Sequence, residues 1–455
     1  MSPDTALRRR LSQHAVQGRW ALFTGVGLAL ALIGTLLFVL ALASGQAQRA
    51  WHLFHVNWVV VTGLTGGSIA LVAVHKIAKA RWSGLLIRFS STAIVCFPLV
   101  LVGLLLIFTV GYDHIYGPMQ QELHSLPHGK ALWLSKPWMF ARLAVGLVAL
   151  AFVGSALVRQ DMAPDAWEAS RVAEGPRRSA LERLARGFDG SAGQIEAVEE
   201  RVATLAPVYA VLYALVFTLV AFDGLMALQP HWFSNLLGGW YFMGSFLAAN
   251  GLMAWLSFAG GKETGTGHLV SPKQRHDLGK MVFGFSVFWT YLMFAQFLVI
   301  WYGNLPEETG FVFARLWGPW RPIGTAVLLM VFVIPFAGLL GVKPKKWPVT
   351  LGLFTAVSLV GIWLERYLMV MPSITTEAGP VFGLPELGPT LLFPGFFLLL
   401  YGLAAKRFPM VSPRLAESTL TYESHHVVDP HEFLHEEPSA DFVSEDTIEK
   451  EKRER

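Results

Sequence analysis

The sequence predicts an all-α polytopic membrane protein with ten transmembrane helices. Hydrophobic residues make up 53% of the 455 residues and charged residues only 15%, whereas about 25% charge is usual in soluble domains. The hydrophobic residues are grouped in long runs, and roughly 20 apolar residues suffice to cross a hydrocarbon core of about 30 Å. Polar segments with Gly, Pro or clustered charges separate these runs, as is typical of loops outside a membrane.

Ten such runs are spread along the chain. The clearest, residues 281–302, contains no charged residue and ends in Trp301 and Tyr302, whose rings favour the headgroup level of a bilayer. Pro306 then ends the helix in a polar segment. The predicted spans are residues 20–43, 57–75, 89–110, 138–157, 205–228, 236–258, 281–302, 322–340, 347–369 and 387–405.

The first four spans differ in what accompanies their apolar residues. A basic arm, residues 1–19, precedes the first span, which is too long for a secretory signal and has no early small-residue cleavage site, so we expect it to be retained. The second span carries Gly63, Gly66 and Gly67, which would let another helix approach closely. The third is uncharged, and the fourth carries Arg142 one turn inside its start.

Hydrophilic segments interrupt and follow this membrane domain, residues 20–408. Residues 159–204 alternate charges of opposite sign in a helical pattern, which indicates a solvated helix face, with a partner-binding surface as the alternative. A basic turn, residues 343–346, separates the eighth and ninth spans. Residues 409–455 are polar and rich in His and Glu, which predicts a disordered tail.

Basic residues are distributed unevenly between the two sides of the predicted membrane. With ten spans, both termini lie on one side, and that side holds most of the Lys and Arg residues. Because cytoplasmic loops are enriched in Lys and Arg, the arm, the segment 159–204 and the tail are all predicted to be cytoplasmic. Loops on the other side contain Arg49, Lys130, Lys136, Arg315 and Arg321, and the spans contain Arg142 and Arg366.

Four ionisable residues are predicted to share one neighbourhood at the outer face. A rise of about 1.5 Å per residue places Asp223 of the fifth span at a depth similar to that of Glu365 and Arg366 of the ninth, and His231 follows the fifth span. Adjacent residues are about 100° apart on a helix, so Glu365 and Arg366 are expected to find separate partners. Arg366 or His231 would then set the protonation of Asp223. We interpret the group as a proton-handling or quinol-facing cluster, with structural pairing between helices as the alternative.

Four more residues complete the proton-handling or quinone-proximal candidates. Arg142 lies in the fourth span and Gln296 in the seventh, while Glu307 and Glu308 follow the seventh span on the outer side. Gln296 could belong to a proton-carrying chain, although bonding between helices is the commoner role of such side chains. No residue is predicted to be catalytic by itself.

The sequence predicts no metal and no covalently bound cofactor. Cys96 is the single cysteine, which excludes an internal disulfide, a CxxC pair and c-type haem attachment. A b-type haem would need histidines that face one another from within spans, and no pair is placed for it. The formal net charge of +4 is explained by topology-determining loop residues and not by a nucleic-acid-binding face.

Several segments resemble the NrfD/polysulfide-reductase-type membrane subunits of alternative complex III, a quinol:cytochrome c oxidoreductase, and among its two such subunits the chain looks like the second. The resemblance extends over nearly all of residues 20–410. The family pattern has Asp followed by Trp near the end of the fifth span and Asp in the ninth, where this chain has Asp223 before Gly224 and Glu365. The segments are residues 131–143, 221–252, 279–309 and 363–373, with the strings PHW at 230–232 and IWYGNLPEE at 300–308.

This resemblance implies a fold with spans two to five and six to nine in separate four-helix bundles and spans one and ten outside them. It implies a bacterial inner membrane location and partners that include a multihaem cytochrome, an iron–sulfur subunit and a paralogous NrfD-like subunit. The resemblance places quinol oxidation in the paralogous subunit, and it allows menaquinol or ubiquinol to bind in or near this chain. The chain would support quinol oxidation, with proton translocation as an open additional role, and would hold no redox metal of its own. Two alternatives stay open: a purely structural membrane anchor and, less favoured, a secondary transporter, which would show ionisable groups at the midplane.

Overall fold

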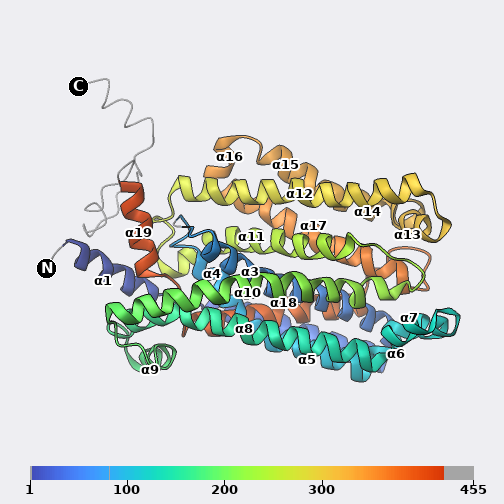
Figure 1. Cartoon of the computed structure of the whole chain (residues 1–455), viewed down its shortest axis with the longest axis horizontal. Helices are drawn as coiled ribbons and strands as arrows, with labels where there is room; N and C mark the ends of the chain where they lie inside the picture. Colours follow the sequence, from blue (N-terminus) through green and yellow to red (C-terminus); the bar gives the residue numbers. More distant parts are fainter. Residues whose placement is uncertain (1–2, 81, 425–455) are drawn as a thin grey trace.

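The computed structural model describes residues 3–80 and 82–424, which form an elongated set of helices (Figure 1). Within these residues, ten helices or helix series are long and apolar enough to cross a membrane, which confirms the predicted fold class. They are α2 (Ala21–Ala43), α3 (Ala47–Ile77), the series α4 to η3 (Ile87–Ser125), α8 (Lys136–Ser170), α10 with η4 (Ala192–Leu228), α11 (Leu237–Thr264), α12 (Pro272–Gly303), the series η5 to α15 (Gly318–Gly338), α17 (Pro348–Ile374) and α18 (Leu384–Ala405).

Two spans are built from several helical pieces, and each contains one π-helical turn. Such turns insert a residue into the helix and locally widen it. The third span comprises α4 (Ile87–Thr92), η1 (Ala93–Cys96), α5 (Phe97–Leu106), the π turn η2 (Ile107–Gly111), α6 (Tyr112–Glu122) and η3 (Leu123–Ser125). The eighth comprises η5 (Gly318–Trp320), α14 (Arg321–Leu328), the π turn η6 (Leu329–Val333) and α15 (Ile334–Gly338).

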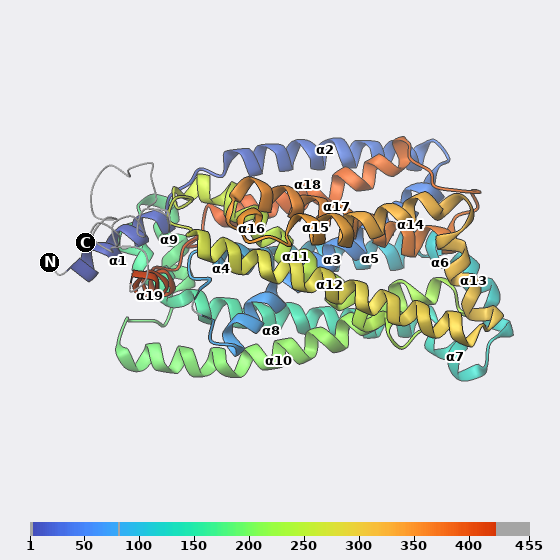
Figure 2. The same cartoon turned by 90° about the horizontal axis from the view of Figure 1, so that it is seen from above.

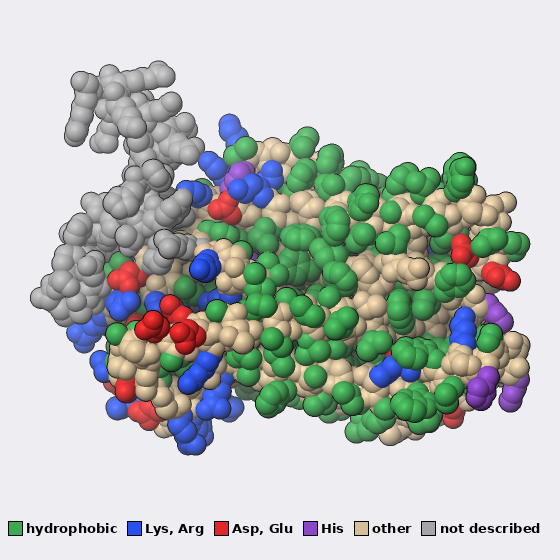
Figure 3. All heavy atoms as spheres, viewed as in Figure 1, with side chains coloured by type: hydrophobic (Ala, Val, Ile, Leu, Met, Phe, Trp, Pro, Cys, Tyr) green, Lys and Arg blue, Asp and Glu red, His purple; other side chains and the backbone are tan. Residues whose placement is uncertain are grey.

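Shorter helices mark the two ends of the molecule (Figure 1). We call the end with α1 (Pro3–Ala15), α9 (Gly175–Leu184) and α19 (Pro413–Ser424) the terminal end, and the end with α6, α7 (His128–Trp133) and α13 (Pro306–Leu316) the distal end. Figure 3 shows Lys and Arg gathered towards the terminal end and hydrophobic side chains over the middle. The basic turn forms the short helix α16 (Val342–Lys346).

The spanning helices form two four-helix groups and one outer pair. The first group contains α3, the third span, α8 and α10, and the second contains α11, α12, the eighth span and α17. Helices α3 and α11 pack against each other and join the groups. As the sequence led us to expect, Gly63 and Gly67 of α3 face Ser245 of α11, where an added Cβ would collide with it.

Helices α2 and α18 lie side by side over their whole length as the outer pair (Figure 2). Glycines spaced seven residues apart make this close contact possible, because an added Cβ at Gly27 or Gly34 of α2 would collide with the backbone of α18. Gly388 and Gly395 of α18 meet the backbone of α2 in the same way. Small residues at such interfaces let helix backbones approach closely within a membrane.

Several spanning helices extend well beyond the predicted apolar runs, because polar residues near their ends have partners inside the protein. Helix α3 begins ten residues before the predicted start, at Ala47. Its early residue Arg49 forms a two-pronged ion pair with Glu386 of α18, at 2.7 and 2.9 Å. The helical pattern predicted for residues 159–204 is interrupted after Ser170, and α9 begins only at Gly175.

A buried network of charges connects four parts of the chain at the terminal end. Arg88 of α4 is fully buried and donates to Asp161 of α8 at 2.6 Å and to Asp165 at 2.8 Å. Lys76 of α3 lies 2.7 Å from the second oxygen of Asp161, and the Ser412 hydroxyl donates to Asp165 at 2.9 Å. Arg88 and Lys76, with Arg414 4.0 Å from Asp161, therefore offset two buried carboxylates. Sequence reasoning assigned these carboxylates to a solvated helix face, and this was wrong.

The first part of the predicted disordered tail, residues 409–424, is ordered. Residues 413–424 form α19, which packs against α1 and α8. Ser412 is buried, and Arg414 forms an ion pair with Glu199 of α10 at 2.5 Å. Fixed partners of this kind order a polar segment that composition alone predicts to be disordered. The remaining tail, residues 425–455, lies outside the described residues.

Candidate functional site

The residues predicted to form one neighbourhood are divided between the two helix groups at the distal end. Asp223 pairs with Arg142 in the first group, whereas Glu365 pairs with Arg366 in the second. The expectation that Arg366 or His231 would be the partner of Asp223 was wrong. Arg142 of α8 is closer in space because α8 and α10 run side by side.

Asp223 is held by a bidentate ion pair. Arg142 Nε donates to one carboxylate oxygen at 2.7 Å and its terminal nitrogen donates to the other at 2.6 Å. The third nitrogen of Arg142 donates to the Trp133 carbonyl at 2.8 Å, and its guanidinium lies 3.9 Å from the centre of the Trp133 ring. The Tyr116 hydroxyl donates to the Asp223 backbone carbonyl at 3.0 Å. This geometry fixes the carboxylate and connects four helices, α6, α7, α8 and α10.

His231, Glu307 and Glu308 lie apart from both ion pairs. His231 is 3.5 Å from Glu122, and both side chains are about half exposed. Glu307 is exposed and Glu308 is half-buried, and both lie in the first turn of α13. Negative side chains near a helix N-terminus stabilise the helix. These three residues have local roles in the structure and do not join the buried groups.

Two buried histidines of α3 are functional candidates that sequence reasoning missed. His55 Nε2 is 2.7 Å from the Gly224 carbonyl, and His52 Nε2 is 3.0 Å from the His114 carbonyl. The Nδ1 atom of each ring has no hydrogen-bond partner among the described residues. Their spacing of three residues within one polar helix turn was the available signal, but the predicted span began only at residue 57.

Glu365 and Arg366 form an ion pair with each other, contrary to the prediction that adjacent helical residues would find separate partners. Both are buried, and the carboxylate oxygens lie 2.6 and 2.8 Å from one terminal nitrogen of Arg366. The two long side chains contact each other although their Cβ atoms point about 100° apart on the helix. Gly244 of α11 leaves room for the guanidinium group, since a Cβ added to Gly244 would lie 2.9 Å from Arg366. The second terminal nitrogen donates to the Tyr241 carbonyl at 3.1 Å.

A cavity of about 310 Å³ adjoins this pair in the second helix group, and we call it the distal pocket. Its polar groups come from six residues: Glu365, Gln296 of α12, Trp240 of α11, Arg315 of α13, and Arg321 and Thr325 of α14. Most of the remaining wall is apolar, which is typical of small-molecule sites. The apolar residues are Met293, Phe294, Phe297, Phe311, Val312, Leu316, Val327, Leu328, Leu368 and Met369.

Four polar atoms of residues lining the distal pocket have no hydrogen-bond partner among the described residues: Gln296 Oε1, Trp240 Nε1, Arg315 Nε and Glu365 Oε2, the last of which is in the ion pair with Arg366. Buried polar groups are normally paired, because leaving one unpaired costs about 1–3 kcal/mol. The pocket therefore offers a hydrogen-bond acceptor and donors to a bound molecule. Phe294 and Thr325 in its wall are exposed, so the pocket opens towards the outer surface between α12 and α14.

Two cations line the pocket, and Arg315 is the buried one, whereas Arg321 is exposed. The sequence suggested only a topology signal for Arg315. Arg315 is 2% exposed and donates to the carbonyls of Phe311 and Met369 at 2.9 and 2.8 Å and to the Ser373 hydroxyl at 2.6 Å. Burial lowers the pKa of Arg315 to about 9. Its guanidinium makes no ion pair with a carboxylate among the described residues, so it would stabilise electron-rich oxygen atoms in the pocket.

The sequence matches no family model, and no curated protein matches it. The described residues contain no group of three or more His, Cys, Asp or Glu side chains placed to hold a metal ion. The absence of a metal in this chain stays a prediction. The arrangement is suited to bind an apolar molecule with a polar head that enters from the bilayer.

Proposed function

We propose that this chain is an integral membrane subunit of a quinol:cytochrome c oxidoreductase of the alternative complex III type, and that its distal pocket binds quinol. The observation that carries the proposal is an apolar cavity, open sideways, with unpaired polar atoms beside a buried Glu365–Arg366 pair. Quinols combine an apolar tail with a ring that carries polar groups at opposite edges. The resemblance of the segments around Asp223, His231 and Glu307 to that family supports the same assignment.

The pocket residues have separate roles under this proposal. Gln296 and Trp240 orient the polar edges of the ring through their unpaired atoms, while Phe297 and Leu368 exclude water from its faces. A bound quinol supplies two electrons and two protons on oxidation. Glu365 accepts one of these protons at its carboxylate, and water at the distal end accepts the other. Before protonation, Arg366 offsets the negative charge of the Glu365 carboxylate. Redox groups on partner subunits, a multihaem cytochrome and an iron–sulfur subunit, would receive the electrons.

Filling the distal pocket should remove bound quinone. We expect Leu368→Trp to lower the quinone that co-purifies with the chain by roughly tenfold, because its larger side chain occupies the space of the ring. Quinone is extracted from protein purified in mild detergent and quantified by chromatography. Leu353→Trp is the matched control, since Leu353 lies on the same helix, is 59% exposed and does not line the pocket. Equal quinone in both variants would contradict binding at this site.

A structural anchor without quinone is the second candidate function. It is favoured by the buried ion pairs Arg142–Asp223 and Arg49–Glu386, which connect helices and need no chemical role. Under this alternative, the distal pocket would hold lipid only. A secondary transporter is less well supported, because Arg142 lies in the second turn of α8 and Asp223 in the last turn of α10, whereas transporters hold ionisable groups at the midplane.

We further propose that both termini are cytoplasmic, as the charge distribution predicts. Cysteines replacing Gly129 and Gly193 test this in a Cys96→Ala background, since an added Cβ at either glycine meets nothing within 4 Å. We expect a membrane-impermeant thiol reagent to label the residue-129 variant in intact cells and the residue-193 variant only after lysis. The reverse pattern would invert the orientation. Labelling of both variants after lysis is the control for accessibility.

A further inference from the structure

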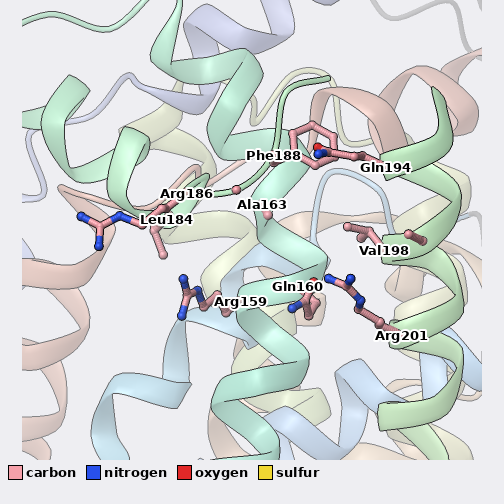
Figure 4. Close-up of a pocket in the computed structure, with 11 residues that line it drawn as sticks. Arg159, Gln160, Ala163, Leu184, Arg186, Phe188, Gln194, Val198 and Arg201 are labelled. Carbon is pink, nitrogen blue, oxygen red and sulfur yellow. The ribbon is translucent and has the colours of Figure 1, made fainter. Parts of the chain in front are cut away.

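A second cavity, of about 250 Å³, lies at the terminal end between α8, the segment after α9, and α10 (Figure 4). Its polar lining is basic, with Arg159 of α8, Arg201 of α10 and Arg186 of the connecting segment. Arg159 and Arg201 stand on either side of Gln160, and Arg186 lies at the edge (Figure 4). No Asp or Glu residue lines this cavity, which we call the arginine pocket.

The three guanidinium groups are available for a ligand. No ion pair or side-chain hydrogen bond joins them to other described residues, and all three residues are exposed. Nearby carboxylates are already engaged, since Glu182 pairs with Arg178 and Glu199 pairs with Arg414. Three like charges around one cavity repel each other, so an anion within the cavity would be stabilised by all of them.

The arginine pocket lies at the edge of an apolar surface. On α8, Val145, Val148 and Phe152 are 70, 52 and 75% exposed, and they lie on the same face as Arg159 at intervals of three, four and seven residues. Phe152 is about 10 Å nearer the middle of the helix than Arg159 at a rise of about 1.5 Å per residue. Single apolar residues exposed in this way along a spanning helix face lipid chains.

Helix α10 repeats this arrangement in the opposite direction. Val208, Val211 and Leu215 are 48, 62 and 61% exposed and share a face with Arg201. Val208 is seven residues from Arg201, as Phe152 is from Arg159. The two neighbouring helices therefore change from lipid-facing apolar residues to unpaired arginines at the same level, where the phosphate groups of a bilayer leaflet lie.

We propose that the arginine pocket binds the headgroup phosphate of an anionic membrane phospholipid, with its acyl chains along the apolar faces of α8 and α10. Guanidinium groups form paired hydrogen bonds with phosphate oxygens, and basic pockets between spanning helices suit anionic headgroups. Gln160 and Gln194 add hydrogen-bond donors to the same cavity. The site is independent of the distal pocket and of the function proposed for it.

Lipid binding to the full chain tests this proposal. Native mass spectrometry in detergent compares phosphatidylglycerol with phosphatidylcholine of the same acyl chains. Wild-type protein should retain phosphatidylglycerol preferentially, and the double variant Arg159→Gln/Arg201→Gln should bind it roughly tenfold more weakly. Unchanged binding by that variant would overturn the proposal, as would equal binding of the two lipids by wild-type protein.

Two control variants separate a shaped site from general charge. Arg9→Gln/Arg19→Gln removes the same charge from exposed residues outside the cavity and should leave the lipid preference intact. Ala163→Leu fills the cavity while keeping all three arginines and should weaken phosphatidylglycerol binding. Weakening by the first control alone would show a non-specific charge effect and contradict the site. Displacement of lipid by equimolar glycerol phosphate would instead identify a soluble anion as the ligand and also overturn the proposal.

Discussion

Replacing Arg88 with methionine should destabilise the chain more than any other single change considered for it. Arg88 is fully buried and bonds both Asp161 and Asp165. Its loss leaves Asp165 without an ion-pair partner among the described residues, while Asp161 keeps Lys76 at 2.7 Å and Arg414 at 4.0 Å. Breaking a buried ion pair by removing one partner costs about 3–5 kcal/mol. Cys96 is buried, so a thiol-reactive dye whose fluorescence rises on unfolding measures the effect as a lower transition temperature.

A control variant and a rescue variant test whether the loss of stability in Arg88→Met comes from the buried charges. Arg178→Met removes an exposed ion pair with Glu182 and should change stability by no more than about 0.5 kcal/mol. Adding Asp165→Asn to Arg88→Met should recover part of the loss, because Lys76 then faces a single carboxylate, Asp161. An Arg88→Met chain that unfolds with the wild-type profile would refute the proposed importance of this network.

Replacing Asp223 with asparagine should lower stability by about 3 kcal/mol, because it strands the positive charge of Arg142 in a mostly buried site. Arg142→Met should have a similar effect by stranding Asp223, which is fully buried. Thermal unfolding in detergent, with the same Cys96 dye, measures both variants. We expect the turnover of any correctly assembled complex to be unchanged, since both carboxylate oxygens are occupied by Arg142.

The double variant Asp223→Asn/Arg142→Met is the decisive comparison. It removes both charges and strands neither. Its loss of stability should therefore be smaller than the sum of the losses in Asp223→Asn and Arg142→Met. Asp113→Asn is the control, since Asp113 is an exposed carboxylate at the same distal end. Normal stability with lost turnover in Asp223→Asn would instead indicate that this carboxylate carries protons.

The positions of the ten spans could be predicted because an apolar run of about 20 residues is typical of a membrane-spanning helix. Their lengths could not, because polar residues extend a helix when distant partners bind them. Arg49 and Asp161 illustrate this, since their partners Glu386 and Arg88 are far away in the sequence. Hydropathy assigns such residues to loops, whereas packing buries them. For the same reason, Ser412 and α19 were predicted to belong to a disordered tail: their composition is polar, and their partners are distant in the sequence.

The candidate site was predictable in its residues but not in its pairings. Gln296 and Glu365 were identified as polar residues within spans, and the structure brings both to the distal pocket. Depth along a helix gave no information on which helices are neighbours, so Asp223 was grouped with the wrong residues. Arg315 and Trp240 were missed because a basic loop residue and a tryptophan near a membrane boundary have common explanations unrelated to binding.

The pairing of α2 with α18 has a consequence for how the protein is made. Ribosomes release the chain from its N-terminal side, so α2 enters the membrane first and its partner enters last among the described spans. Until then, the groove above Gly27 and Gly34 is filled by lipid. Helix α2 tolerates this delay because it contains no charged residue and satisfies its own backbone hydrogen bonds. Insertion of α18 is therefore the step that completes the packing of the described spans, before α19 docks on α1 and α8. Nascent chains arrested before Leu384 should keep α2 beside α3 but leave its glycine face without a protein partner, which would expose them to quality-control proteases.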